Sequence, residues 1–506
     1  MRFFFFFEMK SRFCLLIVTL VFLTSCANVR NPVTGQYERT VMDERSELQA
    51  GQKAHQEVLK EYRALENPSL QRYVNSVGQR LAKASHRSAL EWHFTVLDSP
   101  EVNAFALPGG YVYITRGILA YLDDEAELAG VLGHEIGHVT ARHASQRATR
   151  QQAAGVGVLL ANVLGAVLES KGYGGAGDLT NQVSQITAAG YIASYSRDQE
   201  SQADQLGAEY ITQNHYDSAR MIDVIRMLKN QEQFAADTAR SEGRTLPPRT
   251  DWLASHPSSD KRLQDIRQTA LLHHDPKAET GRERYLKAIE GIPFGESREE
   301  GVTRGQQFFH EPMGFALTAP TGWRIKNTSD ALIMMNGASD AALIMRSVPA
   351  DVGTTHADIL QKIFNPINGR TAQATINGFV STYFVGTARV QSGGQTGTQS
   401  VDATLVTGPK QQNYLFLHTA KSAEALQRER ETLLAAEKTF RAISDKDRLL
   451  AHPWKIRLAA FPSGGFTPLA KRSATTLPHA EAQLRLINGA YPDGVIKAGA
   501  QVKVVE

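Results

Sequence analysis

Residues 123–143 read DDEAELAGVLGHEIGHVTARH, and this stretch decides the fold of the region around it. Asp124, followed three residues later by Glu127, resembles a helical capping box. Apolar side chains recur at helical spacing after it, and no proline interrupts them. The stretch therefore predicts one helix, with the motif HEIGH at residues 134–138 in its second half.

The two histidines of this motif have the spacing of metal ligands. Positions four apart lie above one another on a helix, so His134 and His138 can aim at one point. A catalytic zinc site usually has three protein ligands and a water. Glu135 is turned away from the metal and is predicted to hold and deprotonate the attacking water. A helix with two histidines by chance is the alternative, and the glutamate between them argues against it.

A second acidic helix supplies the missing ligand. Glu200 and Asp204 lie one turn apart on one predicted face. A carboxylate completes a His2Glu zinc site, so Glu200 is the candidate third ligand. Asp204 is placed to accept a hydrogen bond from a ligand histidine and fix its tautomer. Taken alone, this helix would be a solvated face; the upstream motif favours the metal. His143 lies off the ligand face and is predicted to be structural.

Composition bounds the function class. The chain has 506 residues, 42% apolar and 21% charged, with a net charge of +3. This length suggests roughly two to four domains with ordinary cores. The charge is too close to neutral to favour nucleic acid as a partner.

The amino terminus predicts export. Basic residues precede an apolar run at Phe13–Leu23, which is too short to span a bilayer, so residues 1–25 are predicted to be a signal peptide. Leu23–Cys26 reads LTSC and resembles a bacterial lipoprotein processing site, which implies lipidation of Cys26. An uncleaved apolar anchor is the alternative. Both place the bulk of the chain outside the cytoplasm, and Ala27 after the cysteine implies the outer membrane by family analogy.

The segments before the motif helix are predicted as follows. Residues 26–42 are polar and turn-rich and predict a tether. Helical patterns follow at Ser46–Tyr62 and Pro68–Lys83, then a strand pattern at Trp92–Leu97. Asn103–Thr115 predicts two short strands around a Pro-Gly-Gly turn.

The first strand of this hairpin is a candidate edge for pairing with an extended substrate. Its residues are Asn103, Ala104, Phe105 and Ala106. A plain structural hairpin is equally compatible with the periodicity. After the motif helix, the nearly uncharged run at Ala153–Leu168 predicts a core helix, or a helix at the mouth of the site that touches lipid or substrate.

HEIGH, the later Glu200-x-x-Ala203-Asp204 and the upstream NAFALPGGYVYITRGIL together resemble the M48 family of metallopeptidases, the Ste24/HtpX-like gluzincins, and in particular its secreted bacterial lipoproteins. The similarity covers about residues 40–270, and residues 43–270 are predicted to form the metalloprotease domain. It implies one zinc ion per chain, held by His134, His138 and Glu200, with Glu135 as the general base. Asp204 would accept a hydrogen bond from a ligand histidine without binding the metal itself.

Residues 255–262, SHPSSDKR, also match this family. Its members have a His-Pro loop near the metal, so the resemblance implies that His256 regulates the site or contacts the transition state. A histidine in a surface loop is the alternative.

The rest of the chain predicts three further parts. Residues 271–305 are charged and glycine-punctuated and predict a linker. Residues 306–447 alternate strand-like runs with two helical patterns and predict an α+β domain, whose opening GFALTAPTGW resembles PsbP/Mog1-like domains. Residues 450–506 resemble a degenerate LysM module of βααβ order, which implies peptidoglycan as a partner. Gly464–Thr467 departs from that module's usual Gly-Asp-Thr turn.

The predicted fold class is therefore α+β: a mainly helical zincin-type metalloprotease domain with a small sheet, then an α+β domain and a LysM-like module. The predicted function is that of a lipid-anchored zinc metalloendopeptidase on the periplasmic side of the outer membrane. It would degrade or process misfolded or misassembled periplasmic or outer-membrane proteins. The alternative is a latent protease, closed by His256, that acts as a chaperone-like assembly factor or a peptidoglycan-binding scaffold. A cell-wall amidase would rest on the tail alone.

Overall fold

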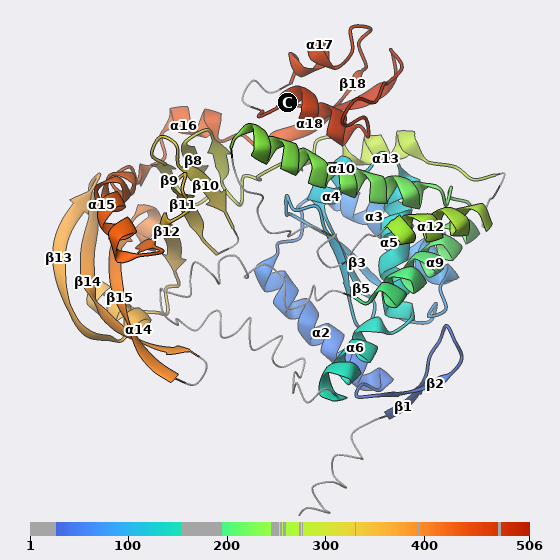
Figure 1. Cartoon of the computed structure of the whole chain (residues 1–506), viewed down its shortest axis with the longest axis horizontal. Coiled ribbons are helices and arrows are strands. Elements are labelled where there is room, and N and C mark those ends of the chain that lie inside the picture. Colours follow the sequence, from blue (N-terminus) through green and yellow to red (C-terminus); the bar gives the residue numbers. More distant parts are fainter. Residues whose placement is uncertain are drawn as a thin grey trace, which may run out of the picture.

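A computed structural model describes residues 27–153, 195–243, 252, 256, 260–272, 275, 277–328, 330–392, 395–473 and 477–506. Over these residues the chain combines helices with several sheets, which confirms the α+β class (Figure 1). No helix in the described ranges is long and apolar enough to cross a membrane. The predicted signal peptide, Cys26 and residues 154–168 of the apolar run lie outside the described residues.

The motif helix α5, Glu125–Thr140, is the centre of a helical unit, and every one of its residues is buried. Asp124 begins it by accepting a hydrogen bond from the Glu127 backbone N–H. The Glu127 carboxylate accepts from the Asp123 backbone N–H instead of that of Asp124, so the predicted capping box closes one residue earlier. Helices α3 (Pro68–Ala84), α9 (Arg197–Gln213) and α10 (Arg220–Ser241) pack around α5.

Glycines set the close approach of α5 and α9. A Cβ atom on Gly207 would lie 3.0 Å from the His134 backbone nitrogen, and one on Gly137 would lie 2.9 Å from the Ala203 carbonyl oxygen. The first gap is tighter than nine in ten real Cβ contacts, and the second is shorter than real Cβ contacts show, so larger residues would force the helices to shift. The glycines therefore let the acidic face of α9 reach the histidines of α5.

A three-stranded sheet lies beside this unit, in the order β3 (His93–Leu97), β5 (Tyr111–Thr115), β4 (Ala104–Leu107). β4 and β5 form the predicted hairpin, and the turn places Gly109 and Gly110 at φ angles of 81° and 92°, which favour glycine. Helices α2 (Glu44–Glu61) and α4 (Arg116–Tyr121) contact this sheet. Helix α6 (His143–Ala153) contacts α5, and α12 (Asp260–Leu272) contacts α9 and α10.

Two stretches predicted to be connectors are ordered elements. In the predicted tether, β1 (Ala27–Arg30) and β2 (Tyr37–Thr40) form a hairpin that contacts α6, since Thr40 Oγ1 lies 2.7 Å from Ser145 Oγ. The predicted linker contains α13 (Arg282–Ile289), β6 (Pro293–Phe294) and β7 (Val302–Arg304). Its apolar residues drive this packing: Tyr285 is fully buried and donates a hydrogen bond to the Leu119 carbonyl.

A second unit is built on a seven-stranded antiparallel sheet in the order β10-β11-β12-β16-β15-β14-β13. Its strands are β10 (Arg324–Asn327), β11 (Leu332–Met335), β12 (Ala341–Val348), β13 (Pro366–Ile376), β14 (Phe379–Ser392), β15 (Gln395–Thr407) and β16 (Asn413–Ala420). Helices α14 (His356–Phe364) and α15 (Ala423–Glu437) cover opposite faces, because alternate strand residues join two separate apolar clusters. The adjoining elements are β8 (Gln307–His310), β9 (Phe315–Thr318), η1 (Pro409–Gln411), β17 (Arg441–Ala442) and α16 (Asp445–Leu450).

The tail has the predicted strand–helix–helix–strand order: β18 (Trp454–Ala460), α17 (Phe466–Ala470), α18 (Ala480–Ile487) and β19 (Gln501–Val505). β18 and β19 are antiparallel, and β6 joins them as a third strand. The apolar side chains of the tail belong to the same buried cluster as those of the helical unit. Lys503 is fully buried and donates to the Leu122 carbonyl just before α5. The tail is thus packed into the core of the helical unit.

Candidate metal centre

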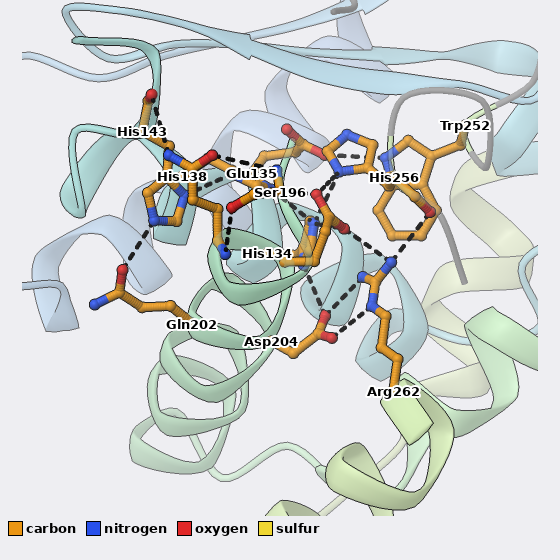
Figure 2. A network of polar contacts seen from close by, with 12 residues as sticks. His134, Glu135, His138, His143, Ser196, Gln202, Asp204, Trp252, His256 and Arg262 are labelled. Atoms are coloured by element: carbon orange, nitrogen blue, oxygen red, sulfur yellow. Dashed lines mark hydrogen bonds and ion pairs between the residues drawn. The ribbon is translucent and has the colours of Figure 1, made fainter. Parts of the chain in front are cut away.

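Four buried side chains converge where α5 faces α9 (Figure 2). They are His134, His138, Glu200 and His256, and their ligand atoms all lie within 4.8 Å of one another. Each residue is about 1–2% exposed. The structure thus brings together the three predicted ligands and the histidine of the His-Pro loop.

The helices explain this convergence. His134 and His138 lie one turn apart on α5, with Nε2 atoms 2.9 Å from each other. Ser196 caps α9 through a capping box with Gln199, which places Glu200 in the first turn. Its carboxylate oxygens lie 3.7 Å from His134 Nε2 and 3.5 Å from His138 Nε2.

Asp204 fixes the tautomer of His134. Arg262 donates to both Asp204 oxygens, at 2.6 and 2.8 Å. Burial alone would raise the pKa of Asp204, but the Arg262 guanidinium outweighs it and holds this pKa below its ordinary value. Asp204 is therefore a carboxylate that accepts the Nδ1 proton of His134 at 2.9 Å. The Nε2 lone pair of His134 then faces His138.

His143 fixes the tautomer of His138. Its Nε2 donates to Gln202 Oε1 at 2.9 Å, and its Nδ1 lies 2.8 Å from Nδ1 of His138. Burial lowers the pKa of His143 to about 4, so it is neutral and its Nδ1 accepts the proton of His138 Nδ1. Burial, helped by the neighbouring histidines, also lowers the pKa of His138. Its Nε2 lone pair therefore faces that of His134.

Two lone pairs 2.9 Å apart repel each other unless a cation lies between them. Two imidazole nitrogens and a carboxylate are the donor set of a His2Glu zinc site. Glu135 is beside them: its Oε1 accepts a hydrogen bond from Trp252 Nε1 at 3.0 Å. Its buried Oε2 has no hydrogen-bond partner among the described residues. The residues present therefore fit a metal ion with a free carboxylate oxygen next to it.

His256 is an integral part of the cluster, with its side chain 1% exposed. Its Nδ1 lies 3.0 Å from Glu200 Oε1 and 3.1 Å from His134 Nε2. Arg262 also donates to the His256 carbonyl, at 3.1 Å. The ring of Tyr195 stacks on that of His138, with centroids 3.8 Å apart. Together these side chains close the cluster from solvent.

Residues 68–270 match the sequence pattern of peptidase family M48. The chain carries a peptidase family M48 domain. This confirms the resemblance inferred from the motifs. The prediction of zinc is likewise confirmed: M48 peptidases depend on zinc, and this M48 domain holds the buried cluster described above.

Relatives of the M48 domain come from bacteria and mitochondria. The beta-barrel assembly-enhancing protease of Yersinia pestis is 31% identical over 204 residues, which are 40% of this chain and 40% of that protein. The protein of the same name from Escherichia coli K12 is 31% identical over 208 residues, 41% and 40% of the two chains. The mitochondrial metalloendopeptidase OMA1 of Schizosaccharomyces pombe is 31% identical over 227 residues, 44% and 60%. The chain thus spans about two fifths of the length of its bacterial relatives.

One solved structure is similar to a part of this chain. Cyanobacterial PsbP of Synechocystis is 15% identical, and the match covers 29% of this chain and 98% of that chain, with a TM-score of 0.21. This score supports no fold assignment. The PsbP-like character of residues 306–447 stays a prediction.

The predicted substrate strand lies near the centre of the M48 domain but is covered. β4 is an edge strand by its topology, and Asn103, Ala104 and Phe105 are each 5% exposed or less. Ala106 and Leu107 line a cavity of about 10 Å³ with His138 and Tyr195. The strand therefore reaches the cluster, and its edge is closed in this conformation.

Sequence reasoning missed four residues of the M48 centre: His143 as an orienting group, Tyr195, Trp252 and Arg262. Arg262 stands in the segment that matches the family, where a buried cation opposite Asp204 could have been sought. Trp252 and Tyr195 carry no comparable signal, because their contacts cross 117 and 57 positions of the chain.

Proposed function

We propose that this chain is a zinc metalloendopeptidase of the bacterial envelope. The observation that carries the proposal is the arrangement in which His134 and His138 turn deprotonated nitrogens toward one another beside Glu200. His134, His138 and Glu200 are the proposed ligands. Zinc, when bound there, polarises the scissile carbonyl and makes a water nucleophilic near neutral pH.

Glu135 is the proposed general base. Trp252 holds one carboxylate oxygen, so the other, unpartnered among the described residues, is directed to the reacting water. It takes a proton from this water and passes it to the leaving amine. Asp204 and His143 keep the two ligand histidines in the tautomers that leave Nε2 free.

The proposed substrates are misfolded or misassembled periplasmic or outer-membrane proteins. The bacterial relatives are named as beta-barrel assembly-enhancing proteases, which supports this choice. The LTSC sequence ending at Cys26 supports lipid anchoring on the periplasmic side of the outer membrane.

One observation favours a second candidate, a latent protease that serves mainly as an assembly factor. His256 lies among the proposed ligands, and Tyr195 covers His138. In that case the site would cleave only after the His256 segment moves away.

Cleavage of an unfolded casein-like substrate by four forms of the full chain separates these candidates. They are the wild type, Glu135→Gln, His256→Ala and the exposed control His452→Ala. The proposal expects Glu135→Gln to retain zinc and lose about 10²–10⁴-fold in rate. A Glu135→Gln chain that cuts at the wild-type rate would refute the mechanism. Activity that appears only in His256→Ala would favour the latent protease.

The LysM-like tail is proposed to bind peptidoglycan. Deleting residues 450–506 is a poor test, because their apolar side chains complete the core of the helical unit. Val495 is 95% exposed in the tail, and Leu449 is 72% exposed before it. We expect Val495→Glu, but not Leu449→Glu, to reduce retention on purified cell-wall sacculi. Equal retention of both variants would argue against the tail as the glycan site.

A further inference from the structure

The edge strand β13 is unusually open. It is the outermost strand of the seven-stranded sheet and pairs only with β14 among the described strands (Figure 1). Nine consecutive residues, 367–375, are exposed. Because side chains alternate along a strand, this run is open on both faces of the sheet. Its outer edge presents a row of backbone N–H and C=O groups to solvent.

The other sheet edges in the described part of the chain are shorter. The other outermost strands are two to five residues long, whereas β13 has eleven. Residues 395–402 of β15 reach beyond its pairing with β16 and form a shorter open stretch than β13. The opposite edge of the same sheet, β10, has four residues, and two of these are the cations Arg324 and Lys326. Short length and charge are the usual protections of an edge strand. β10 has both.

β13 is protected only at its beginning. Pro366 precedes a register shift, and Arg370 is its single charged residue. The following six residues, 371–376, read TAQATI and contain no charge, proline or glycine. Such a segment is a ready template for another strand. Residues 371–376 therefore lack the charges and prolines that usually protect an edge strand.

We propose that β13 captures an extended segment of an unassembled client protein by adding it to the sheet as an eighth strand. The inference rests on the proposed function, since it names the clients as β-rich chains with unpaired strands. Backbone hydrogen bonds would supply the affinity, so many sequences would be accepted. β13 and β14 carry Arg370 and Arg389 and no carboxylate, which favours neutral or acidic strands over basic ones.

A second copy of this chain is the weaker occupant. Antiparallel pairing of two β13 strands about their midpoint, Thr371, would place two Arg370 side chains diagonally across the new pair. Long side chains reach each other at that spacing, so the like charges would oppose association.

The test measures binding apart from hydrolysis. The full chain carrying Glu135→Gln is titrated against a labelled, urea-diluted outer-membrane β-barrel polypeptide, and fluorescence anisotropy reports binding. A urea-diluted all-helical polypeptide of similar length is the comparison probe. We expect the barrel polypeptide to bind more tightly, and Ala372→Lys/Ala374→Lys to weaken its binding about tenfold or more.

A matched control adds the same charges to a helix of the same unit, away from any sheet edge. Gln427 and Ala435 are exposed on α15, so Gln427→Lys/Ala435→Lys should leave binding unchanged. Thr371→Lys/Gln373→Lys places the charges on the opposite face of β13 and should weaken binding as the first pair does. This second pair guards against a folding defect in one variant.

Equal binding of all variants, or equal weakening by the edge and control pairs, would overturn the proposal. A wild-type dimer in sedimentation equilibrium that the edge lysines dissociate would overturn it in favour of self-pairing. Cleavage is measured separately in chains with Glu135 intact. Absence of cleavage with binding that depends on β13 would refute the protease and leave the strand-capture site standing.

Discussion

Two buried histidines in this chain, His138 of the metal centre and His418 of the seven-stranded sheet, have opposite electrostatics. Burial and the neighbouring histidines lower the pKa of His138, whose Nδ1 faces Nδ1 of His143. In the same centre, however, the Glu200 and Glu135 carboxylates outweigh burial and raise the pKa of His256. In the seven-stranded sheet, His418 lies between Asp402, 2.9 Å from its Nδ1, and Glu437, 2.8 Å from its Nε2. Burial alone would lower the pKa of His418, but the two carboxylates raise it to about 9.

The difference teaches how the neighbours of a buried histidine decide its role. With two carboxylates, His418 is itself the cation and joins β15, β16 and α15. With other imidazoles beside it, His138 has a lowered pKa, so its Nε2 is available to a metal ion. The first arrangement is a structural ion cluster, and the second is suited to a metal.

Removal of the metal should produce the largest effect. Chelation with 1,10-phenanthroline should lower cleavage of an unfolded substrate about thousandfold, because Glu135 alone cannot activate water. It should also lower the temperature at which the M48 domain unfolds, since the Nε2 lone pairs of His134 and His138 would then face each other. Zinc added back should restore both. Amide exchange around His418 is the internal control, and a change there on chelation would break the contrast between the clusters.

Replacing His418 should be next in size. His418→Gln leaves Glu437 buried without its cation and leaves Asp402 paired with Arg430, 3.3 Å away. Loss of one partner of a buried ion cluster costs about 3 kcal/mol, roughly a hundredfold in the folding equilibrium. Urea unfolding of the full chain measures this. Zinc content should stay at one ion per chain, and a loss of zinc would show that the two clusters are coupled.

The same cluster predicts a pH dependence. The folded-state pKa of His418 is raised to about 9 from an ordinary value of 6.5, so folding favours its protonated form. Its stabilisation is complete below about pH 6.5 and is lost as the pH rises through about 9. Urea midpoints between pH 6 and 10 should fall for the wild type and be flatter for His418→Gln. If the urea midpoints of the two chains changed with pH in parallel, the raised pKa of His418 would be contradicted.

A smaller effect is expected for His143. His143→Phe keeps an aromatic ring but removes the acceptor for the Nδ1 proton of His138. Loss of such an orienting partner costs about tenfold or more in metal affinity. Competition with a zinc-binding dye measures it. His86→Phe is a matched control, since His86 contacts the Tyr210 hydroxyl away from the cluster, and it should bind zinc as the wild type does.

Prediction from sequence succeeded where chemistry follows local spacing. The i, i+4 histidines and the carboxylates of α9 converge as their helical periodicity requires, and the hairpin at residues 103–115 forms around its glycine turn. Prediction from sequence failed for the two segments predicted to be a tether and a linker. Residues 27–40 and 282–304 look polar, yet a few apolar residues such as Tyr285 are enough to pack them onto the helical unit.

The sequence by itself determined the donor types and their helical faces, because a helix converts spacing along the chain directly into geometry. Only the tertiary structure decided the tautomers, set by Asp204 and His143, and the closed state made by His256 and Tyr195. It also decided that the tail shares its core with the helical unit and that β13 is left open. These features depend on contacts between residues far apart in the chain, which local periodicity does not encode.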